Sequence, residues 1–200
     1  FKPLRQCVIL FSGGEPTISP TFLDACRYAK KVGFYRVLAA TNGIRFAQDL
    51  EFAKQAAEAG LDGAYLQFDG VGNEVNQHRG VGNLFDVKLQ ALDHMYQAGM
   101  KATLVVTVLK GVNNDNVGRI VEFAVENLDK ISTIAFQPVS FTGRDEDVDD
   151  ETRRLRRYTL AALAHDLRNQ VGQPEPLRDW YPLSSFSAFT SVMDMLSGQD

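Results

Sequence analysis

Cysteine is scarce in this sequence of 200 residues, which contains only Cys7 and Cys26. Two thiols cannot by themselves supply the three or four cysteine ligands of a cysteine-based metal site. Both lie in apolar stretches, and free cysteine is one of the residue types most often buried. We therefore expect two buried thiols rather than a disulfide or a metal centre.

Long apolar runs are also missing, since none approaches the roughly 20 residues that a membrane helix needs. The first residues do not have the pattern of a signal peptide, so we expect a cytoplasmic protein without a transmembrane segment. An excess of basic residues is absent too, because 21 Lys and Arg face 25 Asp and Glu, for a net charge of -4. The basic residues are scattered, which argues against nucleic acid as a partner.

The 44% hydrophobic content allows a chain of this length to bury roughly 70% of the surface that it exposes when unfolded. Five short apolar runs rich in β-branched residues predict strands at residues 7–11, 35–39, 64–68, 102–108 and 131–136. Segments with helical spacing lie between them, at intervals of about 30 residues, the size of a βα unit. Parallel strands joined by helices predict an α/β fold, either a barrel or an open doubly wound sheet.

Cap residues and glycines predict where the helices begin and end. Ser19, which precedes a proline, is expected to start the first helix, and Gly33 is expected to end it. Gly60 and Gly99 are expected to end the next two helices as left-handed caps. The Asn-Asn-Asp run at 113–115 offers caps for another helix.

The pattern changes in the last third of the chain. Residues 142–151 form an acidic connection, and residues 152–170 have the spacing of one charged helix, which we expect to pack outside the sheet. A final short helix is expected near 189–196. These features divide the chain into a core at 1–143 and a helical C-terminal extension at 144–200.

Polar residues follow every predicted strand, and in folds built of βα units the ligand lies at the carboxyl ends of the strands. The first of these turns contains Gly13 and Gly14, which let a ligand approach the backbone, followed by Glu15. Backbone carbonyls and a carboxylate suit an ammonium group better than a phosphate. The turn also lacks the lysine of a P-loop and the third glycine of a dinucleotide-binding fingerprint.

The ordered set of turns resembles the radical S-adenosylmethionine (SAM) superfamily. Residues 12–17, Ser-Gly-Gly-Glu-Pro-Thr, look like the GGEP turn after the second barrel strand, and 41–43, Thr-Asn-Gly, like the TNG turn after the third. Residues 67–70 with 78–80 resemble the S-x-D-G and H-D-x-x-R-G pattern of the fourth unit in SPASM/twitch-type members. The last two predicted strands resemble the fifth and sixth. The resemblance covers roughly residues 5–143.

This resemblance implies a partial (β/α)6 TIM-like barrel in which a [4Fe-4S] cluster reductively cleaves SAM to a 5'-deoxyadenosyl radical. The radical abstracts hydrogen from a small-molecule, lipid or peptide substrate, and a reductant such as flavodoxin or ferredoxin supplies the electron. The residues assigned to SAM are Gly13, Gly14 and Glu15 at the amino group, Arg79 at the carboxylate, Thr41 and Asn42 beside the methionine portion, Gln67 and Asp69 toward the ribose and cluster, and Gln137 to Val139 beside the adenine. No catalytic residue is assigned.

Three departures from the family pattern accompany the resemblance. The C-x-x-x-C-x-x-C loop that holds the cluster has no counterpart here, so its cysteines must lie before Phe1 or be missing. The chain alone is therefore expected to be inactive, and none of its residues is assigned as a metal ligand. Gln67 replaces the usual serine of the fourth strand, and His78 directly precedes Arg79, which shortens that loop.

The tail resembles a subgroup of the same family. Residues 137–144 and 180–185 are similar to those of proteins that include the archaeal tetraether lipid synthases, which makes a lipid-like substrate one option. The additional cysteines that hold an auxiliary cluster in that subgroup have no counterpart in this sequence.

Two other functions stay open. An ordinary TIM-barrel lyase or aldolase would share the βα rhythm, but it needs a Schiff-base lysine or a metal triad at the strand ends, and Lys110 is the only lysine near one. A non-catalytic SAM-binding or scaffold protein would account for the missing cysteines. His94 and His165 lie in helical segments and are expected to be structural or solvated.

Overall fold

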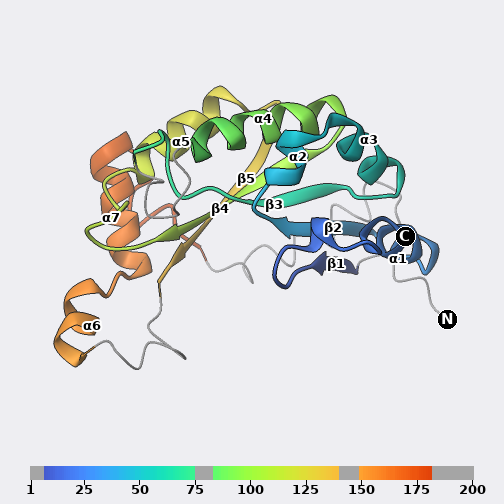
Figure 1. Ribbon diagram of the computed structural model, residues 1–200. Coiled ribbons are helices and arrows are strands. Elements are labelled where there is room, and N and C mark those ends of the chain that lie inside the picture. The colour runs from blue at the N-terminus through green and yellow to red at the C-terminus, as the bar shows by residue number, and fades with distance from the viewer. Residues whose placement is uncertain (1–6, 75–82, 140–148, 182–200) are drawn as a thin grey trace.

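The fold is given by a computed structural model, in which the structure describes residues 7–74, 83–139 and 149–181. Strands and helices alternate along the chain (Figure 1). The strands are β1 (Val8–Phe11), β2 (Arg36–Thr41), β3 (Gly63–Gln67), β4 (Lys101–Val108) and β5 (Ile131–Pro138). The helices are the 3-10 turn η1 (Pro16–Ile18), α1 (Phe22–Lys31), α2 (Ile44–Gln48), α3 (Leu50–Glu58), α4 (Leu84–Gln97), α5 (Val117–Glu126), α6 (Asp150–Arg156) and α7 (Leu160–Val171).

The five strands form one sheet in the order β1-β2-β3-β4-β5, and each neighbouring pair is parallel. A sequential order is that of an arc of a barrel, whereas a doubly wound sheet reverses its order at a switch point. Helices α2 to α5 lie on the same face of the sheet (Figure 1), as the outer helices of a barrel do. The predicted α/β fold with a partial barrel of parallel strands is confirmed.

One face of the sheet is buried under the helices and the other is partly open. Along β4, Leu104 and Val106 are fully buried, whereas Val105 between them is only half-buried. Successive side chains of a strand point to opposite faces, so this alternation separates a covered face from an open one. The covered face packs against helix residues such as Phe46 and Met95 in the hydrophobic core. The open face is therefore the inner surface of the arc.

Two predicted helix starts are displaced. Ser19 does not cap α1, because its amide donates to the Pro16 carbonyl (3.1 Å) and ends η1, and α1 begins after Thr21. Asn116, and not the run 113–115, precedes α5. The predicted glycine caps are confirmed, because α1, α3 and α4 are followed by glycines with positive φ. These are Gly33, Gly60 and Gly99.

The helical extension differs from the prediction of a single helix over 152–170, because it forms two helices, α6 and α7. Tyr158, between them, is buried and donates its hydroxyl to Asp166 (2.6 Å). The hydroxyl of Thr159 then caps α7 by accepting a hydrogen bond from the amide of Ala162 (3.1 Å). Burial of one aromatic ring thus breaks a segment whose apolar spacing is continuous.

Helix α7 packs against α5, which confirms that a helix of the extension lies outside the sheet. The amide of Gly118 donates to the side-chain oxygen of Gln170 (2.8 Å), and a Cβ at Gly118 would lie 2.6 Å from the Gln170 Cβ. Glycine is therefore required for this close approach. The proposed boundary at residue 143 and the helix near 189–196 lie outside the described residues.

The expectation of two buried thiols is wrong for one of them. Cys26 is fully buried, but Cys7 is exposed. Among the described strands β1 pairs with β2 alone, so it forms an edge of the sheet, and Val8 and Leu10 are 52% and 43% exposed. The apolar run around Cys7 shows that a strand forms, but it does not show that this strand lies at an edge.

Candidate functional site

A cavity of about 410 Å³ opens at the carboxyl ends of the strands, and we call it the rim cavity. Its volume lies in the usual range for small-molecule sites. Its lining residues are Leu10, Gly13, Gly14, Glu15, Ala40, Thr41, Asn42, Tyr65, Gln67, Val105 and Gln137. The fold therefore brings together most of the predicted site residues, from turns that are far apart in the sequence.

The carboxylate of Glu15 joins the first two turns of the rim cavity. Its Oε1 accepts hydrogen bonds from the hydroxyl of Thr41 (2.8 Å) and from the hydroxyl and amide of Thr17 (2.6 and 3.2 Å). Its Oε2 accepts a hydrogen bond from the amide of Asn42 (2.7 Å). Hydrogen bonds to an ionised acceptor are stronger than neutral ones. Glu15 therefore holds the turn after β1 against the turn after β2.

The turn after β2 is also held by hydrogen bonds within the turn and by a lysine of α4. The Thr41 hydroxyl accepts a hydrogen bond from the amide of Gly43 (3.0 Å), and the Asn42 side chain accepts one from the amide of Ile44 (2.9 Å). Lys88 of α4, which is 2% exposed, donates from Nζ to the Asn42 carbonyl. The polar groups that the sequence singled out at Thr41 and Asn42 thus shape the turn that lines the cavity.

Gly43 and Arg45 complete this part of the rim. Gly43 has a φ of +79°, and a Cβ there would lie 2.5 Å from Leu66 Cδ1, so a side chain would strain the backbone and displace Leu66. Arg45 donates to the Thr17 carbonyl (2.5 Å), and its guanidinium lies 4.0 Å from the centre of the Phe52 ring. This arginine is therefore engaged by the protein itself.

Gly13 and Gly14 present exposed backbone beside the cavity. Gly13 has a φ of +138°, and a Cβ built on either glycine would meet no atom within 4 Å. No protein atom fills the space next to these two glycines. This space is available to a ligand that approaches the backbone of Gly13 and Gly14.

The other predicted site residues lie elsewhere. Asp69 is 2% exposed and accepts a hydrogen bond from the side-chain amide of Gln67 (3.3 Å), so it supports Gln67 and does not line the cavity. Val139 donates its amide to the Val108 carbonyl (3.0 Å) and lines a second hollow. Arg79 lies outside the described residues.

Sequence reasoning missed the apolar floor of the rim cavity, which consists of Leu10, Ala40, Tyr65 and Val105. These residues lie within strands, whereas the prediction considered only the turns. Tyr65 precedes Gln67 by two positions, and alternate residues of a strand share a face. The period of two within each strand is the signal that could have identified the floor, which offers an apolar surface to a ring or a methylene chain.

Asn113 ties the ends of β3 and β4 together, a role that neither its place after a predicted strand nor its prediction as a helix cap indicated. It is 1% exposed, and its Nδ2 donates to the carbonyls of Asp69 and Thr107 (2.8 Å each). Its Oδ1 accepts a hydrogen bond from the amide of Leu109 (2.8 Å). The buried amide thus fixes the two turns that border Gln67.

We expect Asn113→Asp to lower the free energy of unfolding by about 3 kcal/mol, because an ionised carboxylate cannot donate to two carbonyls and is costly to bury unpaired. Urea unfolding measures this loss. Asn169→Asp, which makes the same change at an exposed position of α7, is the control and should have little effect. Equal stability of the two variants would show that Asn113 does not form these hydrogen bonds to Asp69 and Thr107.

The described residues contain no group of three or more His, Cys, Asp or Glu side chains that could hold a metal ion. Burial raises the pKa of Cys26 to about 11, so its thiol stays protonated near neutral pH. Iron-sulfur clusters are held by several thiolates. The described residues therefore do not fit an iron-sulfur cluster.

The other candidate residues give no support to an ordinary lyase. Lys110 is exposed and is absent from the lining of the rim cavity, where a Schiff-base lysine would be needed. His94 is structural, because its Nδ1 lies 2.7 Å from the Phe46 carbonyl oxygen, and His165 is exposed. His78 lies outside the described residues.

A family profile and several known proteins match the sequence. The profile described as the radical SAM superfamily matches residues 5–124. The 7,8-dihydro-6-hydroxymethylpterin dimethyltransferase of Methanocaldococcus jannaschii is 34% identical over 190 residues, which are 94% of this chain and 37% of that protein. The Fe-coproporphyrin III synthase of Methanosarcina barkeri is 33% identical over 155 residues, which are 77% of this chain and 37% of that protein. The chain thus spans little more than a third of the length of these relatives.

A solved structure shares the fold. Streptococcus suis SuiB aligns with a TM-score of 0.58 over 81% of this chain and 34% of its own, at 18% identity. At this level of identity the likeness concerns the arrangement of strands and helices alone.

Proposed function

Because this chain belongs to the radical SAM superfamily, we propose that its rim cavity binds SAM as part of a radical SAM enzyme. In such an enzyme a [4Fe-4S] cluster would supply the electron for the reductive cleavage of SAM, and the resulting 5'-deoxyadenosyl radical would abstract a substrate hydrogen. The described residues do not fit the cluster, and we assign its ligands to none of them. The part proposed for this chain is to bind and orient SAM.

The observation that carries the proposal is the composition of the rim cavity. Residues as distant in the sequence as Gly13 and Gln137 line one space, and the resemblance had assigned them to one ligand. The cavity combines a carboxylate, exposed glycine backbone, side-chain amides and an apolar floor. SAM carries a cationic amino acid portion and an aromatic base, so both ends of the molecule find suitable chemistry there.

The contacts refine the roles at the methionine end. The Glu15 carboxylate already accepts hydrogen bonds from Thr17, Thr41 and Asn42, so it cannot serve the ammonium group alone. The exposed carbonyls of residues 12–14 are proposed to complete that site. Arg79 remains the proposed partner of the SAM carboxylate.

The residues from β3 and β5 that line the rim cavity are proposed to contact the adenosine end of SAM. Gln67 lines the cavity and donates a hydrogen bond to Asp69. Its side-chain amide is proposed to contact the ribose hydroxyls. Gln137 and the apolar floor are proposed to contact the adenine ring, and Val139 to border it by way of the end of β5.

The substrate and the electron donor are proposed from the family and the relatives. The similarity to the dimethyltransferase covers 94% of the chain and so includes α6 and α7, which makes a small heterocyclic molecule the first substrate to test, before a lipid or a peptide. Flavodoxin or ferredoxin in the cytoplasm is the proposed reductant. Within residues 7–74, 83–139 and 149–181, no helix has the length and apolar character needed to cross a membrane.

Alanine at the two glycines tests the proposal. Gly14→Ala is expected to fold as the wild type does, because its Cβ meets nothing, yet to bind SAM at least about tenfold more weakly, since the methyl group occupies ligand space. Gly13→Ala should lose SAM affinity and also about 1 kcal/mol of stability, because its φ is positive. Calorimetric titration with SAM and thermal unfolding separate the two effects.

Gly111→Ala is the matched control. Gly111 has a φ of +78°, its Cβ would meet nothing within 4 Å, and it does not line the rim cavity. This variant should lose stability as Gly13→Ala does and keep its SAM affinity. If Gly14→Ala bound SAM as tightly as the wild type, the rim cavity would not be the SAM site.

A further inference from the structure

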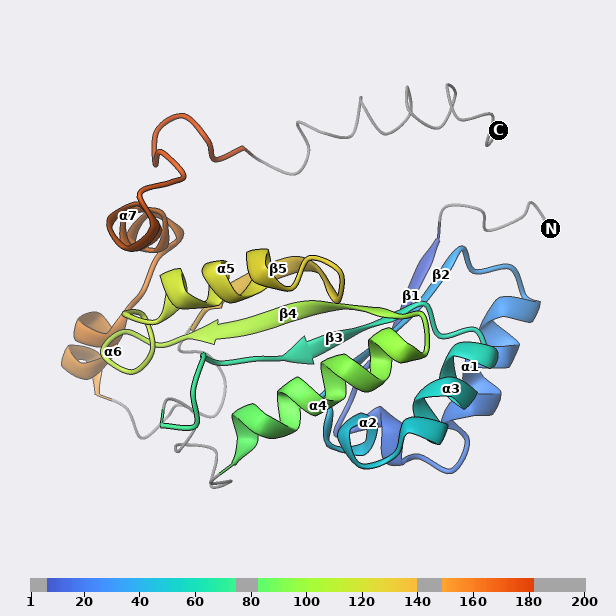
Figure 2. The same ribbon diagram turned by 90° about the horizontal axis from the view of Figure 1, so that it is seen from above.

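A second hollow, of about 740 Å³, lies between the end of β5 and the connection from α6 to α7, and we call it the arginine hollow. Figure 2 shows α6 beyond the carboxyl ends of β3 and β4, at the end of the sheet to which the strands point. Three arginines line the hollow, namely Arg153, Arg154 and Arg157. No function assigned so far uses them.

Arg153 is engaged by other groups of the protein, whereas Arg154 and Arg157 are exposed. Arg153 approaches Asp150 at 3.5 Å, but the Asp150 side chain is 99% exposed, and exposed ion pairs of this kind are weak. For Arg154 and Arg157 no ion pair with a described residue is found. Three guanidinium groups and the single carboxylate of Asp150 line the hollow, so the lining carries a net positive charge.

The rest of the lining suits an anion that is attached to a larger molecule. The hydroxyl oxygen of Thr159 accepts a hydrogen bond from the amide of Ala162. The hydroxyl hydrogen of Thr159 can therefore be donated to a ligand. The Tyr158 hydroxyl is already used, because it donates to Asp166. Val139 and Leu160 add apolar surface on the wall. Guanidinium groups match the oxygens of a phosphate with paired hydrogen bonds, so a phosphate suits this lining better than a cation or a neutral group.

The arginine hollow and the rim cavity both lie at the end of β5. Gln137 lines the rim cavity, and the next two residues, Pro138 and Val139, line the arginine hollow. A molecule bound in the hollow would therefore lie at the same end of the sheet as the ligand of the rim cavity.

We propose that Arg153, Arg154 and Arg157 bind the phosphate or diphosphate group of a small molecule. That this molecule is the substrate of the radical chemistry rests on the proposed function, but the binding of the anion does not. A simpler explanation is that the arginines only stabilise the C-terminal end of α6 by their interaction with the helix dipole, which predicts no ligand binding.

Titration of the chain with inorganic pyrophosphate, and separately with inorganic phosphate, at constant ionic strength tests this inference. We expect saturable binding, tighter for pyrophosphate because it carries more charge. Single changes of Arg153, Arg154 or Arg157 to glutamine should each weaken it by about two- to fivefold, as for partly exposed charge contacts. The triple variant should show no saturable binding.

Arg156→Gln is the matched control, because Arg156 belongs to the same helix and is absent from the lining of the hollow. It changes the net charge by the same amount and should leave the affinity unchanged. An equal loss of affinity in Arg156→Gln would show that only the net charge of the chain matters, which would overturn the proposal. The absence of saturable binding to the wild type would also overturn it. SAM affinity should stay constant in all four single variants, so a failure here is distinguishable from a failure of the proposed function.

Discussion

Glu15→Ala is expected to weaken both the fold and the binding of SAM. The substitution leaves the amides of Thr17 and Asn42 and the hydroxyls of Thr17 and Thr41 without their shared acceptor. Hydrogen bonds to a charged group contribute about 1.5 to 3 kcal/mol each when they are shielded. The Glu15 side chain is partly exposed and its bonds are mutually dependent, so we expect a total loss of about 3 kcal/mol in the free energy of unfolding.

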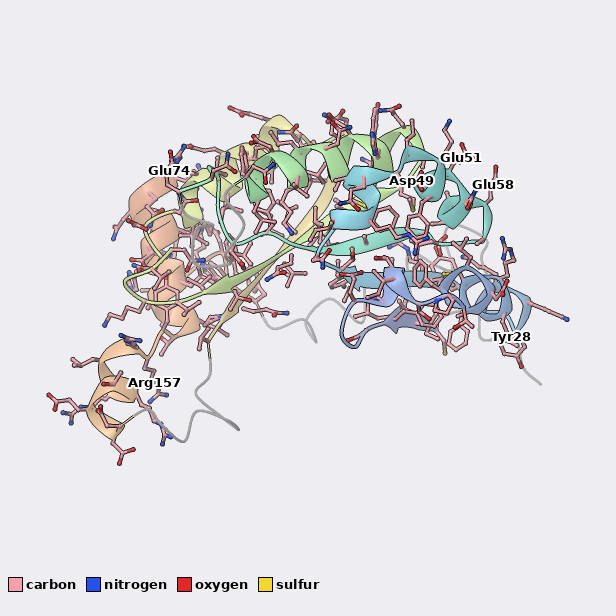
Figure 3. All side chains as sticks on the ribbon, in the orientation of Figure 1. Tyr28, Asp49, Glu51, Glu58, Glu74 and Arg157 are labelled. Atoms are coloured by element: carbon pink, nitrogen blue, oxygen red, sulfur yellow. The ribbon has the colours of Figure 1, made fainter. Side chains whose placement is uncertain are left out.

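Glu15→Ala should also weaken the binding of SAM, because both turns that Glu15 joins line the rim cavity. We expect at least a tenfold loss of SAM affinity under conditions in which the variant is fully folded. Glu15→Gln should be intermediate, since the amide keeps one oxygen acceptor and loses the charge. Glu58→Ala is the control, because Glu58 is exposed on α3, away from the cavity (Figure 3). A Glu15→Ala variant as stable as Glu58→Ala would contradict the conclusion that Glu15 holds the two turns together.

The second large effect concerns the iron-sulfur cluster. We expect the 200-residue chain to retain no stoichiometric [4Fe-4S] cluster after anaerobic reconstitution, because such clusters need several thiolates and the chain has two cysteines. One of these, Cys26, is fully buried, and its raised pKa of about 11 keeps it protonated. We therefore expect no cluster at all rather than a partly occupied one. Without a cluster no SAM cleavage should occur.

Iron analysis and electron paramagnetic resonance measure the bound cluster. Cys7→Ser and Cys26→Ala variants serve as controls, because any iron that they retain is not held by the cysteine that was removed. A stoichiometric cluster whose spectrum responds to SAM in this chain would contradict the account. It would show that groups other than those described can hold the cluster.

The strands and the rim turns could be predicted from the sequence because they depend on local patterns. Each apolar run forms a strand within one or two residues of its predicted bounds, and the glycines that end α1, α3 and α4 have the expected positive φ. The features that were wrong depend on the surroundings. The segment 152–170 divides because Tyr158 is buried, and Cys7 is exposed because β1 is an edge strand among the described strands.

The sequence predicted which residues belong to the candidate site, but not the hydrogen bonds that hold these residues in place. The turn residues Glu15, Thr41 and Asn42 could be recognised, whereas their hydrogen bonds to one another join turns that are distant in the sequence. The same holds for Asn113 and for the buried Lys88, whose partners belong to other βα units. Such contacts follow from the packing of the barrel arc, which a single sequence does not display.

The most direct test of the central claim is amide chemical-shift mapping of SAM binding to this 22.2 kDa chain. It needs no cluster, and it locates the ligand even when the affinity is low. The account predicts saturable shifts concentrated at residues 12–15, 41–43, Gln67 and Gln137, with none at Asn169 on α7. Shifts centred elsewhere on the described chain, or no saturable shift at all, would contradict the assignment of the rim cavity to SAM.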